Sequence, residues 1–347
     1  MQPKVYVILV NYNGWADTIE CASSLRMLSY SNFQIVIVDN CSADDSVSKI
    51  QGWVGGERRP VLNGENCEYE FGGLDTGSQV AAYSWVEAIT RPHRGQCDLP
   101  LILIENPENR GFSGGNNVGI RFGLSRGDAD YFWLLNNDTV VDDDALNALV
   151  ERFRECSRHE ESIAMCGSLI LDFDRRDQVQ AFGGAMVNRF LGSTRNLFAG
   201  KDAKCDDVIQ SKKLPDYVSG CSMLVKAENF SRTGFLDEAY FLYWEDAEWC
   251  FRCKRRGMSL AVASRSRVWH RRGSTSGRYP IIAFYNTRNC LQFFRDYLPA
   301  YLVFCLIAKP LFFTIIALKH RNWPFFRESL RGYWRFLKGG RNGRARW

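Results

Sequence analysis

The sequence has few of the residues and motifs that usually mark a metal site or a cofactor site. Its 347 residues include four histidines. It has neither a P-loop nor a GxGxxG run, so the dinucleotide-binding fingerprint is excluded. Among its twelve cysteines, Cys250 and Cys253 form a CxxC pair, but no second pair accompanies it. Two thiols on the inner face of a helix are therefore a better interpretation than a zinc or redox site.

The chain also lacks internal repeats and the pattern of a signal peptide. Its first apolar run is short and leads into a polar Asn-Tyr-Asn-Gly turn. We therefore expect a reducing, cytoplasmic context with free thiols. Hydrophobic residues make up 46% of the sequence and aromatic residues 14%, which excludes wholesale disorder.

Basic residues are concentrated near the C-terminus, although the net charge of +5 is modest. From Lys319 to Trp347, nine Lys or Arg residues accompany one acid, Glu328. A charge block of this kind is typical of an interaction tail. Nucleic acid and an anionic membrane are both candidate partners for it.

Short apolar runs in the first half of the chain predict buried strands, and each run ends on a polar residue. The runs are Lys4–Val10, Gln34–Val38, Leu101–Ile104 and Tyr131–Leu135, followed by Asn11, Asp39, Glu105 and Asn136. Runs of this length fit strands that are buried on both faces of a parallel sheet. Ligands bind beyond the carboxyl ends of such strands. We therefore expect Asn11, Asp39 and residues 136–138 to gather at one edge.

Helical patterns alternate with these strands, which predicts an α/β domain with a mostly parallel central sheet. The patterns are Asp17–Leu28, Ser113–Gly123 and Asp142–Arg158, with Ser113 and Asp142 as expected N-caps. Residues 51–100 interrupt the alternation and predict a partly ordered surface insertion. Residues 160–280 mix strands with a helix around Glu245–Arg256.

From Ile281 onward the chain is helical and apolar. Leu298–Leu318 is nearly long enough to span a bilayer, but Lys309 and Pro310 lie at its middle. A central lysine costs roughly 2.5–3.5 kcal/mol on insertion scales, and proline breaks a helix. We therefore expect two short helices in the membrane interface, followed by a basic amphipathic tail. A spanning helix and a helical layer buried on the protein itself are the alternatives.

Two stretches could bind parts of a nucleotide or another anionic ligand. Asp39 could accept hydrogen bonds from a base or a ribose, or it could be a turn residue leading into Ser42. In Asn109–Gly119, the glycines allow close backbone approach, while Arg110 and a helix N-terminus suit an anion. A tight connection between a strand and a helix is the alternative for this second stretch.

Two further residues could hold a cation. Asp138 is a hard oxygen ligand at the end of a strand, where a divalent cation could bind a diphosphate. A helix N-cap is the alternative role for Asp138. His270 could be a metal ligand or a phosphate donor, with Arg271 and Arg272 reinforcing phosphate contacts, although a structural histidine is more frequent.

The helix around residues 245–256 carries a carboxylate on its inward face. Asp246 shares that face with Trp249, Cys250 and Cys253, and Gly257 is expected to end the helix. Because burial of an unpaired carboxylate is costly, Asp246 needs a partner or a function. It is either satisfied by helix amides or acts as a general base facing an acceptor.

Taken in order, seven stretches resemble glycosyltransferase family 2, most closely its rhamnosyltransferase-like branch. They are VILVNYNG, VIVDNCSADDS, NRGFSGGNNVGI, FWLLNNDTVV, YVSGCSMLV, GFLDEAYFLYWEDAEWCFR and VWHRRGSTS. The resemblance implies a GT-A catalytic domain at residues 1–280 and a helical, membrane-associated region at residues 281–347. It also implies inverting transfer of a sugar from a nucleotide-diphosphate donor.

The resemblance assigns roles to individual residues. It implies that Asp246 is the catalytic base with Glu245 beside it, and that Asp138 and His270 hold Mg²⁺ or Mn²⁺. The donor-binding positions are Asn11, Asn13, Asp39, Arg110, Gly111, Gly114, Asn116, Asn136 and Asn137. The sequence departs from the family's DxD pattern because Asn136 replaces the first Asp. One carboxylate remains, so the diphosphate and His270 must complete the metal shell.

The resemblance implies a hexosyltransferase on the inner face of the membrane, peripheral and cytoplasmic. Rhamnose or a similar sugar, linked to dTDP or UDP, is the expected donor, and a glycan or lipid-linked molecule is the expected acceptor. An anionic membrane is then the expected partner of the basic tail, rather than nucleic acid. A sugar-phosphate nucleotidyltransferase of similar fold and a non-catalytic membrane-binding protein are the alternatives.

Overall fold

The computed structural model describes residues 2–54, 80–84, 101–158, 162–271 and 280–339. The elements of the first half are β1 (Val5–Asn11), α1 (Trp15–Leu25), β2 (Phe33–Asp39), α2 (Ser46–Val54), β3 (Val80–Ser84), β4 (Leu101–Glu105), α4 (Gly111–Arg126), β5 (Tyr131–Asn136), β6 (Thr139–Val141) and α5 (Ala145–Arg158). Those of the second half are β7 (Ile163–Asp172), β8 (Val179–Phe182), β9 (Gly184–Asn188), β10 (Ser193–Asn196), α6 (Asp206–Ile209), β11 (Tyr217–Val218), β12 (Ser222–Lys226), α7 (Asn229–Thr233), α8 (Glu245–Lys254), β13 (Ser259–His270), α9 (Ile281–Tyr297), α10 (Pro299–His320) and α11 (Trp323–Leu337).

The central sheet has the strand order β3-β4-β2-β1-β5-β12-β7-β13-β6, with β8 paired to β7. The strands from β3 to β5 are all parallel, as predicted. Beyond β5 the sheet is mixed, because β12 runs antiparallel to both β5 and β7. Asn11 pairs with Asp39 and Val10 pairs with Asn136. The expected gathering of polar strand ends at one edge is therefore confirmed.

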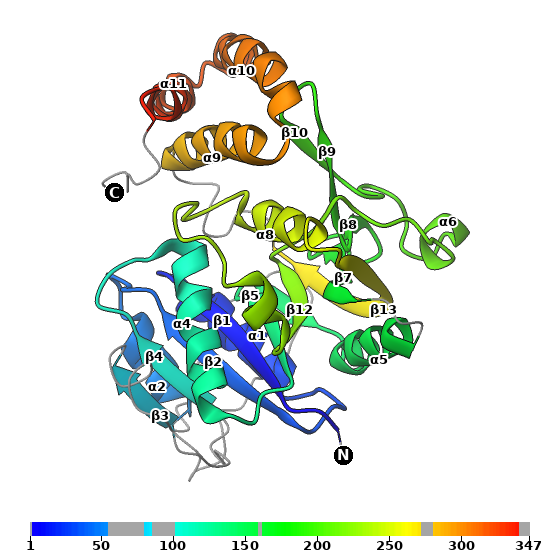
Figure 1. The fold of residues 1–347 in the computed structure, drawn as a ribbon. Coiled ribbons are helices and arrows are strands. Elements are labelled where there is room, and N and C mark those ends of the chain that lie inside the picture. The colour runs from blue at the N-terminus through cyan, green and yellow to red at the C-terminus, as the bar shows by residue number, and fades with distance from the viewer. Residues whose placement is uncertain (1, 55–79, 85–100, 159–161, 272–279, 340–347) are drawn as a thin grey trace.

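Both faces of β1, β2, β4 and β5 are buried, which explains their continuous apolar sequence. Val5, Val7 and Leu9 pack in the core with residues of α1, α2 and α5. Tyr6 and Ile8 pack on the opposite face with residues of α4, α7 and α8, and Figure 1 shows α4 lying across the strands β1 and β2.

The three C-terminal helices form a separate layer at the end of the molecule away from the N-terminal strands (Figure 1). The inner helix, α9, packs on the start of α8, where the rings of Phe293 and Trp244 lie 5.1 Å apart. In turn, α11 packs closely on α9, because a Cβ at Gly332 would lie 2.3 Å from the carbonyl oxygen of Phe284. The C-terminal layer is thus attached to the helix that carries Glu245 and Asp246.

The predicted break at Pro310 is wrong, because α10 continues through this residue. Proline removes the hydrogen bond that would reach the carbonyl of Leu306, four residues earlier. In the structure the Tyr333 hydroxyl of α11 donates to that carbonyl at 3.1 Å. Packing against α11 therefore satisfies the group that the proline leaves without a partner.

Other sequence expectations also need correction. Ser113 lies inside α4 instead of capping it, and α5 begins at Ala145, three residues after Asp142. The ten cysteines in the described ranges are free thiols, as expected. Most of the insertion predicted at residues 51–100 lies outside the described residues; within it, β3 forms an edge of the sheet.

Candidate active site

A cavity of about 400 Å³ opens at the carboxyl edge of the parallel strands. It receives residues from the β5–β6 turn, the start of α8, the end of β13 and the start of α9. The predicted site residues that line it are Gly111, Asn136, Asn137, Asp138, Glu245, Asp246 and His270. The other predicted positions, which are Asn11, Asn13, Asp39, Arg110, Gly114 and Asn116, are not among its lining residues.

Asp138 and His270 meet because β6 pairs with the last residues of β13. The Nε2 of His270 lies 3.2 Å from Oδ1 of Asp138 and 3.3 Å from Nδ2 of Asn136. The Nδ1 of His270 lies 2.6 Å from Oε1 of Gln180 on β8. Because an amide oxygen only accepts, Nδ1 carries the proton in this contact, and the contact fixes the ring so that Nε2 faces Asp138.

These two side chains fit a divalent cation that takes its remaining ligands from a substrate. Within the described ranges, no group of three or more His, Cys, Asp or Glu side chains could enclose an ion. One carboxylate oxygen and one oriented imidazole nitrogen instead face the same space. Mg²⁺ is commonly held in this way, by one or two carboxylates together with phosphates and water.

Asp246 lies at the start of α8 and faces the cavity from the other side. Its Oδ2 accepts from the amide of Gly220 at 3.1 Å, and its Oδ1 accepts from the amide of Ala247 at 2.8 Å. Burial raises the pKa of Asp246 to about 6, although the two amides favour the charged form. The carboxylate is therefore anchored by backbone donors and titrates close to neutral pH.

Glu245 has a different environment, although it is the neighbouring residue. Its Oε2 is buried and has no hydrogen-bond partner among the described residues. Burial, followed by the charge of Asp246, raises the pKa of Glu245 well above its ordinary value. Of the two adjacent carboxyl groups, Glu245 is thus the one held protonated and Asp246 the one that ionises.

The loop before α8 has an unusual backbone. Phe241, Tyr243 and Trp244 all have positive φ, between 62° and 73°, a conformation that is costly for bulky residues. The Nδ2 of Asn289, which is fully buried in α9, donates to the carbonyls of Tyr240, Leu242 and Tyr243 at 2.6, 2.9 and 2.8 Å. Sequence reasoning missed Asn289; the available signal was an asparagine in a helix that also carries Phe284, Tyr285, Phe293 and Phe294.

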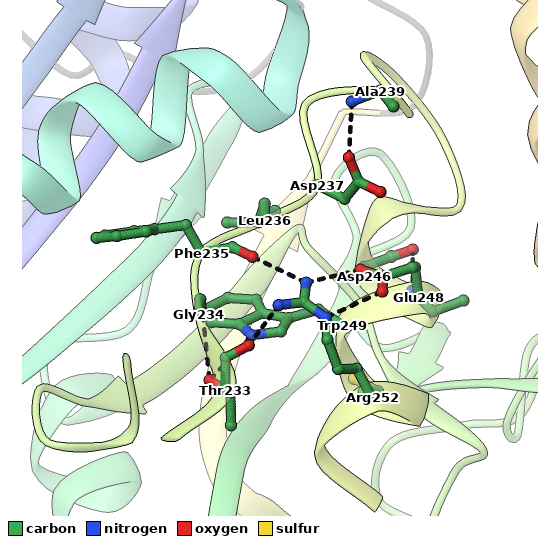
Figure 2. A network of polar contacts seen from close by, with 12 residues as sticks. Thr233, Gly234, Phe235, Leu236, Asp237, Ala239, Asp246, Glu248, Trp249 and Arg252 are labelled. Atoms are coloured by element: carbon green, nitrogen blue, oxygen red, sulfur yellow. Dashed lines mark hydrogen bonds and ion pairs between the residues drawn. The ribbon is translucent and has the colours of Figure 1, made fainter. Parts of the chain in front are cut away.

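Arg252 fixes the other side of α8 (Figure 2). Its guanidinium donates to both carboxylate oxygens of Glu248, at 2.9 and 2.7 Å. It also donates to the carbonyls of Thr233 and Phe235, the latter at 2.8 Å. Figure 2 shows these contacts converging on one guanidinium. They tie α8 to the preceding loop and hold the orientation of Asp246.

A chain of buried hydrogen bonds joins Asp39 to the β5–β6 turn. The Nδ2 of Asn137 donates to Oγ1 of Thr18, and that hydroxyl donates to Oδ1 of Asn11, both at 2.8 Å. The Nδ2 of Asn11 donates to Oδ2 of Asp39 at 2.8 Å. Ser42 also donates to both oxygens of Asp39, through its amide and its hydroxyl, so the turn contact weighed for Asp39 is present.

Glycines of the Asn109–Gly119 stretch bring backbone close to other parts of the protein. A Cβ at Gly111, whose φ is +67°, would lie 2.2 Å from the carbonyl oxygen of Phe241, and one at Gly115 would lie 2.7 Å from Val10. The guanidinium of Arg110 lies within 3.7 Å of the carboxylates of Glu108 and Glu238. The stretch therefore forms a tight connection between a strand and a helix, and the anion-binding role expected for it stays a prediction.

Asn40 organises this connection, and sequence reasoning missed it as well. Its Nδ2 donates to the side chain of Asn109 and to the carbonyl of Gly111, both at 3.0 Å. Its Oδ1 accepts from Asn106 and from the amide of Arg110, also at 3.0 Å. The position of Asn40 directly after Asp39 was the available signal.

Arg271 does not take the expected place near phosphates. It pairs with Asp17 at 3.0 Å and Glu20 at 2.5 Å, both on α1, and lies over the ring of Phe173. Its neighbour Arg272 lies outside the described residues.

Two family models match the chain. The model described as glycosyltransferase-like family 2 matches residues 77–284, and the model described as glycosyl transferase family 2 matches residues 6–86. The first match covers well over half of the chain, including the β5–β6 turn, α8 and β13.

Curated relatives and a solved structure are also similar. The hexosyltransferase Agl10 of low-salt glycan biosynthesis, from Haloferax volcanii, is 24% identical over 159 residues, which cover 45% of this chain and 47% of that protein. The dTDP-rhamnosyl transferase RfbF from Shigella flexneri is 23% identical over 237 residues, which cover 64% of this chain and 73% of that protein. The chain spans about half the length of the first curated relatives it matches.

The solved structure is the mannosyltransferase PcManGT from Pyrobaculum calidifontis in complex with GDP-Man and Mn²⁺. The TM-score is 0.52 at 14% identity, and the match covers 97% of this chain and 88% of that one. At this level of identity the likeness concerns the fold. The predicted GT-A fold is therefore confirmed.

Proposed function

Because the chain belongs to glycosyltransferase family 2, we propose that it moves a sugar from a nucleotide-diphosphate donor to a hydroxyl group of an acceptor, with inversion at the anomeric carbon. The observation that carries this proposal is the cavity. It has the close pair of Asp138 and His270 on one side and the anchored, partly buried carboxylate of Asp246 on the other.

Asp246 is the general base of this reaction. Its ionised carboxylate accepts the proton of the acceptor hydroxyl while that oxygen forms a bond to the anomeric carbon. The bond from this carbon to the diphosphate oxygen breaks at the same time, and the nucleotide diphosphate leaves with the electron pair. Glu245 stays protonated beside Asp246, so a second negative charge does not build up next to the base.

Asp138 and His270 would hold the divalent cation, Mg²⁺ or Mn²⁺. When it is bound, this cation supplies positive charge against the departing diphosphate. The mannosyltransferase PcManGT was solved in complex with Mn²⁺ and a nucleotide sugar, which supports a cation in this role. Asn136 contacts Nε2 of His270 and orients the pair.

The donor lies along the carboxyl edge between Asp39 and Asp138. Its nucleotide is placed near Asn11, Asn13 and Asp39, and its diphosphate near the start of α4. That end of the site includes Arg110, Gly111, Gly114, Asn116 and Asn137. Rhamnose, linked to dTDP or UDP, is the proposed sugar, and the name of RfbF supports dTDP.

Residues 1–280 form the catalytic domain, and residues 281–347 place it on the cytoplasmic face of a membrane. One helix, α10, is long and apolar enough by length and composition to cross a bilayer. Ile282 of α9 lines the cavity, and α9 also supports α10 and α11. An acceptor linked to a lipid fits this arrangement.

The test begins with a thermal-shift screen of nucleotide sugars with and without Mn²⁺, since a ligand that binds the folded state raises Tm. The donor so found is then used with the variant Asp246→Asn. We expect transfer to fall by about 10²–10⁴-fold, the range for loss of a general base, with donor binding unchanged. The matched control is Asp144→Asn, an exposed acid before α5.

Retained turnover in Asp246→Asn would show that another group is the base. Release of pyrophosphate from a nucleoside triphosphate and a sugar phosphate would instead identify a nucleotidyltransferase.

A further inference from the structure

Helix α10 has a narrow buried stripe and a broad exposed apolar face. Cys305, Lys309, Phe313 and Ala317 recur every fourth residue and face the protein, since each is at most 8% exposed. The outward side is formed by Val303, Phe304, Ile307, Leu311, Phe312 and Ile315, which are 46–62% exposed. We call these six residues the apolar face. Monomeric proteins seldom expose apolar surface of this kind without a partner.

The one charged residue in the middle of α10 points away from this face. Lys309 is 8% exposed and lies next to Cys290. Burial raises the pKa of this thiol, and the ammonium group of Lys309 partly opposes that rise. A spanning orientation would detach the buried stripe from α9 and carry this ammonium into hydrocarbon. With α10 lying flat, Lys309 stays buried in the protein and the apolar face is free of charge.

The tip of the β9–β10 hairpin extends the apolar face. Phe190 and Leu191 are more than half exposed, and the ring of Phe190 lies 5.3 Å from that of Phe304. Below the tip, the thiol of Cys290 donates to the carbonyl of Gly192 at 3.1 Å, so the hairpin is tied to α9. Figure 1 shows the hairpin reaching the start of α10.

The apolar face has two candidate partners, a membrane and a second copy of the chain, and the charge beside the face distinguishes them. Lys319 and Arg321 are exposed at the C-terminal end of α10, and Trp323, which is 57% exposed, follows them. A twofold dimer through the apolar face would not need a basic helix end or an exposed tryptophan beside it. An anionic bilayer complements the basic end, and exposed tryptophan is typical of its interface.

We propose that α10 lies in the plane of an anionic bilayer, with its apolar face and the Phe190–Leu191 hairpin tip inserted side by side. The hairpin is thus a second membrane-binding element, far in sequence from the C-terminal helices. This inference rests on the membrane localisation proposed above. It is tested by binding and not by sugar transfer, so either proposal can fail without the other.

The test is co-sedimentation of the full chain with vesicles of phosphatidylglycerol and phosphatidylethanolamine, compared with neutral phosphatidylcholine vesicles. We expect binding to the anionic vesicles, and a loss of about tenfold or more in Phe190→Ser/Leu191→Ser, because two large apolar side chains no longer enter the bilayer. Leu311→Ser/Ile315→Ser should lose at least as much. Ile209→Ser, an exposed apolar residue on α6, is the matched control.

A conservative exchange, Phe190→Leu/Leu191→Phe, separates insertion from misfolding and should bind like the parent protein. Alkaline carbonate should release the bound chain, whereas a spanning helix would resist it. The inference is overturned if the hairpin variant binds normally, if carbonate fails to extract the chain, or if the same substitutions dissolve a dimer that does not bind vesicles.

Discussion

Asp138 and Asp246 face the same cavity, yet their surroundings give them different chemistry. The carboxylate of Asp138 lies 3.2 Å from an imidazole nitrogen, an arrangement suited to sharing a cation. The carboxylate of Asp246 accepts hydrogen bonds from two backbone amides, and burial raises its pKa to about 6. Neighbouring groups, and not residue type, therefore separate the proposed metal ligand from the proposed base.

After the loss of the base itself in Asp246→Asn, the largest effect on this comparison is expected at the β5–β6 turn. Asp138→Ala removes the only carboxylate of the proposed cation pair, so transfer should fall by about 10²–10³-fold, comparable to losing a strong electrostatic contact in the transition state. Titration with Mn²⁺ should also show a weaker apparent affinity. Asp142→Ala, on the same connection but outside the cavity, is the control. Unchanged metal-dependent transfer would reduce the turn to a structural role.

The next effect concerns the loop that presents Asp246. Asn289→Ala removes the buried amide that three carbonyls of that loop share, so the free energy of unfolding should fall by about 2–4 kcal/mol. Denaturant unfolding measures this change. Transfer should also fall by about tenfold, because the carboxylate loses its fixed position. An unchanged kcat in a folded Asn289→Ala protein would show that the loop before α8 keeps its conformation without Asn289.

A smaller effect is expected in the hydrogen-bond chain between Asp39 and the turn. Thr18→Val removes the hydroxyl that joins Asn137 to Asn11, while Thr18→Ser keeps it. We expect Val, but not Ser, to lower the free energy of unfolding by about 1–3 kcal/mol and to weaken donor binding. If Val and Ser behave alike in a binding titration, the chain of bonds does not position the donor.

The smallest effect on rate belongs to Glu245. Since Asp246 must be ionised to accept a proton, kcat/KM should decline as the pH falls below about 6. Because the shift of Asp246 comes from its burial, Glu245→Gln should keep this midpoint and most of the rate. Burial also raises the pKa of Glu245 in the folded state. Above about pH 4.3, the usual pKa of an unfolded glutamate, this carboxyl therefore lowers the free energy of unfolding. The Gln variant should therefore show a higher Tm at pH 7, but not at pH 4. A shifted midpoint in the rate profile would mean that Glu245 is ionised.

Several parts of the fold could be predicted because local pattern and tertiary packing agree there. The apolar runs that became β1, β2, β4 and β5 were found because burial on both faces leaves a continuous signal. Gly257 was also found as the glycine after α8, although the helix itself ends at Lys254, and its φ of +74° explains why a glycine stands there. Pro310 was misjudged because the group that compensates for it, Tyr333, lies on a different helix.

The sequence alone determined the α/β class, the polar ends of the parallel strands and the inward position of Asp246, since these follow from periodicity and spacing along one element. Only the tertiary structure decided that His270 meets Asp138, that Asn289 holds the loop before Asp246, and that the β9–β10 hairpin joins the apolar face of α10. Each of these contacts joins residues from different elements, separated by tens to more than a hundred positions in the chain. Such contacts leave no local pattern, because they depend on how packed elements are placed relative to one another.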